Sequence, residues 1–112
     1  MTRKILITIN ENNVAPRFDL ATEIWISSLA ARGEETKEKT VVLPHASAED
    51  LCRLILAEEV DTVICGGIEE EFFQYLNWKK ITVFDSIIGP WARALERLQR
   101  NELKAGTVLY DR

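Results

Sequence analysis

The stretch VICGGIEEEFF, residues 63–73, holds the pattern that decides the fold of this chain. A short apolar run ends at Cys65, two glycines follow, and three glutamates begin a segment with helical periodicity. This order predicts a buried strand that turns sharply into a helix. The N-terminus of such a helix presents free N–H groups, where anions bind in many proteins. The glutamates favour a structural role instead, because acids in the first turn stabilise the helix dipole.

Further strands and helices are predicted on both sides of this junction. Apolar runs rich in β-branched residues predict strands at 4–9, 22–29, 39–44, 61–67 and 80–85. Apolar stripes at helical spacing predict helices after Ser47 (a candidate N-cap), at 69–78, and after Gly89-Pro90. A loop or irregular hairpin is predicted at 10–21, a charged turn at 31–39, and a short strand or loose end at 102–112.

The order of these elements, β-β-β-α-β-α-β-α, predicts an α/β fold in one domain that spans residues 1–112. Short connections join the first three strands, which are therefore expected to pair antiparallel. Helical crossovers precede the last two strands, and such crossovers bring strands together in parallel. The prediction is a mixed five-stranded sheet with flanking helices, in the manner of ribonuclease H-like domains.

Composition and charge exclude several classes of partner. The net charge is −4 and the basic segments are short and interrupted, which is not the pattern of a nucleic-acid-binding protein. No apolar run approaches the length of about 20 residues that crosses a bilayer, and the N-terminus lacks a secretory signal pattern. A cytoplasmic protein that binds neither nucleic acid nor membrane is expected. Two cysteines and one histidine are too few for a disulfide framework or a zinc site of Cys and His.

The carboxyl ends of the predicted parallel strands are the expected place for a ligand. Three loops follow these ends, at Ile9–Asn13, Cys65–Gly67 and Asp85–Gly89. If the three strands are neighbours, the loops converge on one rim of the sheet. Asn10 and Asn13 in the first loop are then candidate ligand-binding residues.

Gly66 and Gly67 are the second part of this candidate site. Without Cβ atoms they allow positive φ and let a ligand approach the backbone. The N–H groups of 68–70, beginning with Ile68, would face the same space and favour an anion. The alternative is that the two glycines only make a tight turn from strand to helix.

Arg17 and Phe18 lie in the loop predicted to face the glycines. Arg17 is a planar, permanently charged donor that could clamp an anionic ligand. Alternatively it pairs with Asp19 or Glu23 and only fixes the loop. From its residue type, Phe18 is expected to fill the core rather than to contact a ligand.

Metal ligation and catalysis have few candidate residues. Cys65 is a candidate soft metal ligand, although a cysteine on a buried strand more often packs as a small hydrophobe. Cys52 is expected to pack inside a helix face, and His45 is expected to be a loop residue that could supply one imidazole. Motifs for a nucleophile or a nucleotide-binding loop are absent, and a two-metal nuclease needs several converging carboxylates, whereas Asp85 alone ends a strand at the rim. The protein is therefore predicted not to be an enzyme.

Several stretches resemble one family. VAPRFDLATEIWI (14–26), TVICGGIEEEF (62–72) and ALERLQRNELKAG (94–106) are similar, in this order, to the dinitrogenase iron–molybdenum cofactor biosynthesis family, of the NifX or NifB C-terminal type. The most specific element pairs an Arg/His-Phe-x-x-Ala loop with a later Gly-Gly-Ile. Its residues here are Arg17, Phe18, Ala21, Gly66, Gly67 and Ile68.

The resemblance implies a ribonuclease H-like fold without nuclease chemistry. It also implies non-catalytic binding or carriage of an iron–molybdenum or other metal–sulfur cluster, or of its precursor, in the cleft between these loops. The cofactor-binding residues would be Asn10, Asn13, Arg17, Phe18, Gly66, Gly67 and Ile68, with Cys65 as the metal ligand. A protein partner in cofactor assembly is a further implication. Asp19 and Glu69 stand where this family commonly has glycine, and both add negative charge near the predicted cleft.

A second function belongs to a different class. On the same fold, the cleft could be sealed, and the chain could act as a protein-interaction or regulatory module that has lost cluster binding. The acidic start of the helix at 69–78 favours this alternative. It also depends on whether Trp25, Trp78 and Trp91 are exposed, because an exposed aromatic patch indicates a partner surface.

Overall fold

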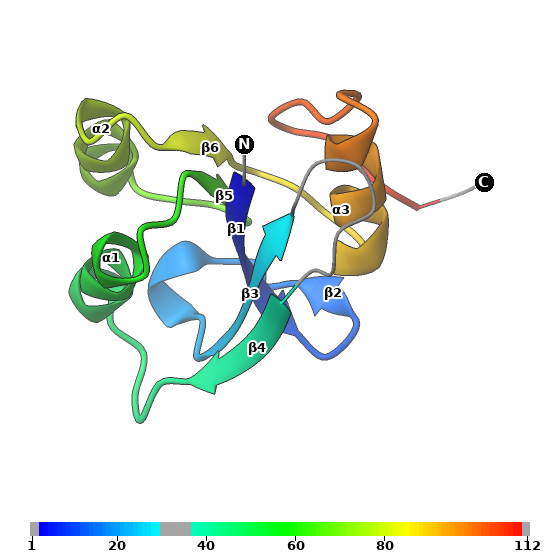
Figure 1. The fold of residues 1–112 in the computed structure, drawn as a ribbon. Coiled ribbons are helices and arrows are strands. Elements are labelled where there is room, and N and C mark those ends of the chain that lie inside the picture. Colours follow the sequence, from blue (N-terminus) through cyan, green and yellow to red (C-terminus); the bar gives the residue numbers. More distant parts are fainter. Residues whose placement is uncertain (1–2, 30–36, 111–112) are drawn as a thin grey trace.

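The computed structural model describes residues 3–29 and 37–110, which form a mixed α/β sheet covered by helices (Figure 1). The strands are β1 (Arg3–Asn10), β2 (Asn13–Val14), β3 (Glu23–Leu29), β4 (Lys37–Val42), β5 (Thr62–Ile64) and β6 (Thr82–Phe84). The helices are α1 (Ala48–Ala57), α2 (Glu70–Trp78), α3 (Trp91–Gln99) and the 3₁₀ turn η1 (Phe18–Leu20). None of the helices in the described ranges is long and apolar enough to cross a membrane.

Strand β1 is the centre of the sheet, whose order is β4-β3-β1-β5-β6. Its apolar run explains this position, because Ile5, Leu6 and Ile7 are all fully buried. β1 pairs antiparallel with β3 and parallel with β5, and β5 pairs parallel with β6. The predicted antiparallel pairing of the first strands and parallel pairing of the last ones are both confirmed.

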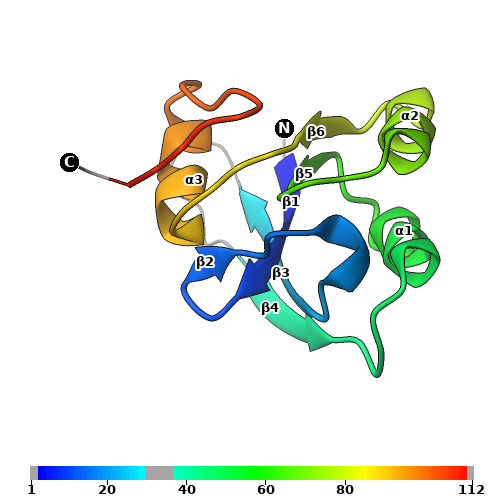
Figure 2. The ribbon, with the colours of Figure 1, turned by 180° about the vertical axis from the view of Figure 1, so that it is seen from behind.

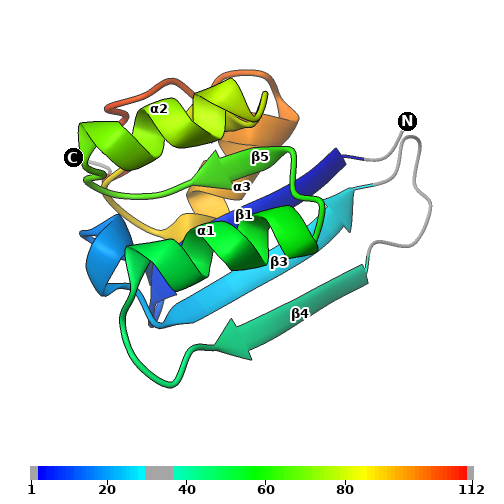
Figure 3. The same cartoon turned by 90° about the vertical axis from the view of Figure 1, so that its left-hand side faces the viewer.

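The two faces of the sheet bury separate hydrophobic cores. Leu6 and its neighbours pack beneath α1 and α2, which lie side by side over one face (Figure 3). Ile5, Ile7 and Trp25 pack instead with the buried residues of α3, which covers the opposite face (Figure 2). The alternation of side chains along β1 and β3 is what divides the apolar residues between the two cores.

The sheet differs in detail from the predicted five strands. It has six, because two residues of the loop at 10–21 form β2, which pairs with β1. β4 begins at Lys37, inside the predicted charged turn, because pairing with β3 stabilises Lys37–Lys39 as strand despite their charge. The rest of that turn lies outside the described residues. The tail is neither a regular strand nor loose: Val108 bridges to Ile88, and Leu109 is buried.

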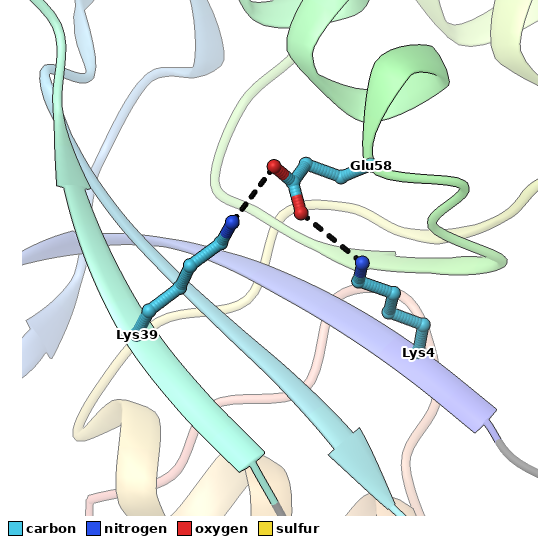
Figure 4. A network of polar contacts seen from close by, with 3 residues as sticks. All are labelled: Lys4, Lys39 and Glu58. Atoms are coloured by element: carbon cyan, nitrogen blue, oxygen red, sulfur yellow. Dashed lines mark hydrogen bonds and ion pairs between the residues drawn. The ribbon is translucent and has the colours of Figure 1, made fainter.

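Helix α1 begins as its sequence predicts. The Ser47 Oγ accepts a hydrogen bond from the Asp50 N–H at 3.2 Å, which confirms the N-cap. Just beyond the other end, the Glu58 carboxylate pairs with Lys4 of β1 at 3.1 Å and Lys39 of β4 at 2.8 Å (Figure 4). The hydrogen bonds from Lys39 and Lys4 lower the pKa of Glu58 below its ordinary value of 4.5. Glu58 therefore connects α1 to two strands that are not adjacent in the sheet.

Replacing Glu58 tests this connection. Glu58→Gln should lower the free energy of unfolding at pH 7 by about 0.5–1 kcal/mol, since the pairs are only partly shielded from water. The folded-state pKa lies below the unfolded one, so the stabilisation is complete above pH 4.5 and is lost as the pH falls through the folded-state pKa. Urea unfolding at pH 7 and pH 3 should thus give a smaller difference between variant and wild type at pH 3. Glu96→Gln, which removes an exposed pair between Glu96 of α3 and Arg100 just beyond the end of that helix, is the control.

Candidate functional site

The three loops predicted to converge do meet at one edge of the sheet. Together with Tyr110 of the tail, they line a cleft of about 490 Å³. The first loop contributes Asn10 and Asn13, the second Gly66 and Gly67, and the third the residues from 86 to 89. The convergence that the parallel strands predict is confirmed, and the cleft has the volume of an ordinary small-ligand site.

Backbone hydrogen bonds join the second loop to the segment at 15–18, which follows β2. The Gly67 N–H donates to the Pro16 carbonyl at 2.8 Å, and the Phe18 N–H donates to the Gly67 carbonyl at 2.8 Å. Gly66 lies so close to this segment that a Cβ atom there would collide with the carbonyl oxygens of Ala15 and Pro16. Neither Gly66 nor Gly67 has a positive φ. Gly66 is therefore required because the segment at 15–18 approaches it closely. The expectation that positive φ angles explain the two glycines is wrong for both.

The third loop is held by the same kind of contact. The Ser86 N–H donates to the Gly66 carbonyl at 2.9 Å, and the Val14 N–H donates to the Gly89 carbonyl at 2.9 Å. Gly89 has a φ of 122°, in the region that favours glycine. Each wall of the cleft is thus fixed to another by main-chain bonds.

The described residues that line the cleft are all uncharged. Their polar groups are the side-chain amides of Asn10 and Asn13 and the hydroxyls of Ser86 and Tyr110. Apolar surface comes mainly from the segments around Val14 and from 87–88. Such a lining can hold a ligand by hydrogen bonds and by packing, with no charge of its own to attract or repel it.

The three glutamates of the opening motif do not line this cleft. The Glu70 carboxylate accepts a hydrogen bond from Gln74 at 3.1 Å, one turn along α2. Glu71 lines a separate groove of about 330 Å³ between α1 and α2, together with Cys52. Ile68 is half-buried against the core under these helices, outside the lining. The acids therefore stabilise the start of α2 without closing the cleft.

The structure shows where Arg17 and Phe18 lie relative to the cleft. The Arg17 guanidinium donates two hydrogen bonds to Asp19, at 3.0 and 2.8 Å, so the pairing alternative is confirmed. Arg17 lines a smaller hollow of about 270 Å³, together with Leu20 and Glu23. Phe18 is 1% exposed and packs against Phe72, as expected for a core residue. Ligand binding by Arg17 or Phe18 stays a prediction.

Cys65 lies behind the cleft, in the hydrophobic core. It is fully buried, and burial, followed by the nearby charge of Asp85, raises the pKa of its thiol to about 12. Burial, with a smaller effect of Glu49, raises the pKa of Cys52 to about 11. Both cysteines are free and protonated at neutral pH, whereas metals bind the thiolate. The role of Cys65 as a metal ligand stays a prediction.

Metal-ligating groups do not gather elsewhere in the described part of the chain. Within 3–29 and 37–110, no three or more His, Cys, Asp or Glu residues are placed to hold an ion. His45 is exposed, with its Nε2 3.7 Å from an Asp50 carboxylate oxygen. A cluster in the cleft would therefore be held by hydrogen bonds and packing.

Tyr110, like Val14 and Pro16, lines the cleft although the sequence analysis did not name it as a site residue. It follows Leu109, which is buried, and the short apolar run at 108–110 was the available signal. That signal predicts a short strand, but it does not say which edge of the sheet the strand would join.

Comparison with known proteins identifies the family of this chain. The family model for the dinitrogenase iron-molybdenum cofactor matches residues 1–101. The chain belongs to this family. The resemblance carried by the Arg-Phe and Gly-Gly-Ile motifs is therefore confirmed. No curated protein matches the chain.

Solved structures share the fold of this dinitrogenase cofactor family member. The crystal structure of PH0822 superposes with a TM-score of 0.74 at 20% identity, covering 91% of this chain and 94% of that one. A candidate dinitrogenase from Methanocaldococcus jannaschii gives 0.73 at 21% identity, covering 93% and 94%. A candidate NifB protein from Thermotoga gives 0.69 at 16% identity, covering 98% and 97%. At these identities the likeness establishes the fold alone.

Alanine substitutions at the two glycines test the contact between the loops. Gly66→Ala should lower the free energy of unfolding by about 2–3 kcal/mol, because the new methyl group overlaps backbone atoms. Gly67→Ala is the matched control: its Cβ would lie 3.6 Å from the Pro16 carbonyl oxygen, an ordinary contact, and should change stability by less than about 1 kcal/mol. Guanidinium unfolding measures both. Equal effects of the two substitutions would contradict the described approach of the loops.

Proposed function

We propose that this member of the dinitrogenase iron-molybdenum cofactor family binds and carries, without catalysis, a metal–sulfur cluster or its precursor in the cleft. The observation that supports it most is the uncharged, hydrogen-bonding cleft at the carboxyl ends of β1, β5 and β6. Family membership supplies the class of cargo. The ribonuclease H-like fold that the resemblance implies is part of the same proposal.

The lining suits a cargo that arrives with its own ligands. Neither a cysteine nor a histidine belongs to the described residues that line the cleft, so we propose that the cargo keeps its own metal ligands. The side-chain amides of Asn10 and Asn13 instead donate hydrogen bonds to sulfide or oxygen atoms at the surface of the cluster, whereas the Ser86 hydroxyl already donates to the Asp85 carboxylate at 3.1 Å. We leave Cys65 and Arg17 out of this set, because Cys65 is buried and protonated and Arg17 pairs with Asp19.

Binding through hydrogen bonds also suits carriage. Each neutral hydrogen bond contributes about 1 kcal/mol net, so several together hold a cargo that an acceptor with thiolate or imidazole ligands can remove. A partner in cofactor assembly would be such an acceptor or the donor of the cargo. The absence of charge in the described lining also avoids repelling an anionic cluster from the cleft.

Anaerobic reconstitution tests the proposal. Protein incubated with ferrous iron, molybdate and sulfide, then desalted, should retain metal and show charge-transfer absorption. The double substitution Asn10→Ala/Asn13→Ala should weaken retention about 10-fold or more, since two donors are lost. Asn77→Ala, an exposed asparagine on α2 outside the cleft, is the matched control and should behave as wild type.

Two outcomes would count against the proposal. Failure of the wild-type protein to retain any metal or sulfide would overturn it outright. Retention that survives the double substitution but disappears in Cys65→Ser or Arg17→Ala would move the site away from the amides and toward the predicted thiolate or guanidinium.

An exposed aromatic group on α2 favours the second candidate, a protein-interaction module. The Trp78 side chain is 74% exposed, beside Tyr75, and Lys79 Nζ lies 4.7 Å from the Trp78 ring centroid. Trp25 and Trp91 pack against each other, with ring centroids 4.9 Å apart, and Trp25 is buried. Of the three tryptophans, Trp78 thus offers the partner surface.

Pull-down from native extract tests this second candidate. Trp78→Ala should lose a partner that the wild type retains, because truncating an aromatic anchor in an interface commonly costs 2 kcal/mol or more, about a 30-fold loss of affinity. Leu20→Ala, at another exposed apolar residue, is the control. Unchanged capture by the Trp78 variant would remove α2 as the interaction surface.

A further inference from the structure

The tail after α3 forms one wall of the cleft although it lies beyond the family match. The match ends at residue 101, and the lining residue Tyr110 follows nine positions later. In Figure 2 the tail, drawn in orange to red, turns back from the end of α3 toward the other end of that helix. The residue that completes this wall therefore lies outside the range that the family model matches.

The tail is anchored to the β6–α3 loop by main-chain bonds. The Ile88 N–H donates to the Thr107 carbonyl at 3.1 Å, and the Leu109 N–H donates to the Ile88 carbonyl at 2.8 Å. Arg93 adds a hydrogen bond from its Nη1 to the Leu109 carbonyl at 3.0 Å. These contacts fix the backbone immediately before Tyr110.

Packing holds the same segment from below. Leu103 and Leu109 are both buried in the core that α3 covers. Gly89 makes room for this contact, because a Cβ atom there would lie 2.8 Å from the Leu109 Cβ. The burial of Leu103 and Leu109 thus fixes the position of the next residue, Tyr110, at the cleft.

The Tyr110 side chain reaches across to the opposite wall. Its hydroxyl donates a hydrogen bond to the Asn13 Oδ1 of β2 at 3.4 Å. Tyr110 is 57% exposed, so its ring stands at the mouth of the cleft rather than in its floor. A bond of this length between exposed groups is weak, and the hydroxyl can exchange it for an acceptor on a bound cargo at little cost.

We infer that Tyr110 is a cargo-contacting residue that closes one side of the cleft and slows the release of the cargo. The inference rests on the proposed function and assigns that site a residue outside the family motifs. The phenol ring packs against the cargo, and the hydroxyl transfers its hydrogen bond from Asn13 to a sulfide or oxygen atom of the cargo. When the hydroxyl of Tyr110 bonds to the cargo, the side-chain amides of Asn10 and Asn13 can also donate hydrogen bonds to it.

Release kinetics test the inference. Protein loaded anaerobically with ferrous iron, molybdate and sulfide is mixed with bathophenanthroline disulfonate, and the rate of iron release is followed by absorption. Tyr110→Phe should release iron about 5-fold faster through loss of one hydrogen bond. Tyr110→Ala should release it about 10-fold to 100-fold faster through the additional loss of the ring contact. Tyr75→Phe and Tyr75→Ala on α2, outside the cleft, are matched controls and should release at the wild-type rate.

The outcomes separate this inference from the function on which it rests. A wild type that loads and Tyr110 variants that release at its rate would overturn the inference and leave the proposed function standing. A wild type that takes up no cluster would overturn both. Thermal unfolding of each variant excludes a folding defect, and Tyr110→Phe, which keeps the ring, carries the test if Tyr110→Ala is unstable.

Discussion

The contact on which the rest of this structure depends is the close approach of Gly66 and Gly67 to the segment at 15–18. Two main-chain hydrogen bonds join the segments, and Gly66 has no space for a side chain. On one side the contact places Phe18 in the core beneath α1 and α2. On the other side it leaves Pro16 and both glycines as a wall of the cleft. One interaction thus couples the packing of the domain interior to the shape of the site.

Main-chain contacts form the walls of the cleft, and this explains how the acidic first turn of α2 can lie near it. Bonds from Ser86 to Gly66 and from Val14 to Gly89 close the remaining walls, so the shape does not depend on charged side chains. The glutamates at the start of α2 instead face Gln74 and the groove shared with α1. The negative charge of these glutamates therefore lies where it stabilises the start of α2.

Much of this arrangement can be predicted from the sequence, because it follows from patterns that act over short distances. The apolar run of β1 predicts a central strand, and helical crossovers predict parallel neighbours, from which the convergence of the loops follows. Two features depend on contacts between residues far apart in the sequence and could not be predicted. They are the steric reason for Gly66 and the packing of Leu109 against Gly89 that brings Tyr110 to the cleft. Lys37–Lys39 shows the same limit, because its charges suggest a turn and only pairing with β3 makes it a strand.

The position of Cys65 bears on what kind of binding the cleft can support. The thiol belongs to the residue before the glycines, yet it is enclosed in the core and kept protonated by burial and by the charge of Asp85. Making it a ligand would require both deprotonation against a pKa of about 12 and a movement of its side chain out of the core. The Cys65 N–H and carbonyl oppose that movement, since they bond to Phe84 and Ile87. A metal–thiolate bond from Cys65 would therefore carry the cost of deprotonation in addition to the loss of these backbone bonds, whereas the amides of Asn10 and Asn13 line the cleft without either cost.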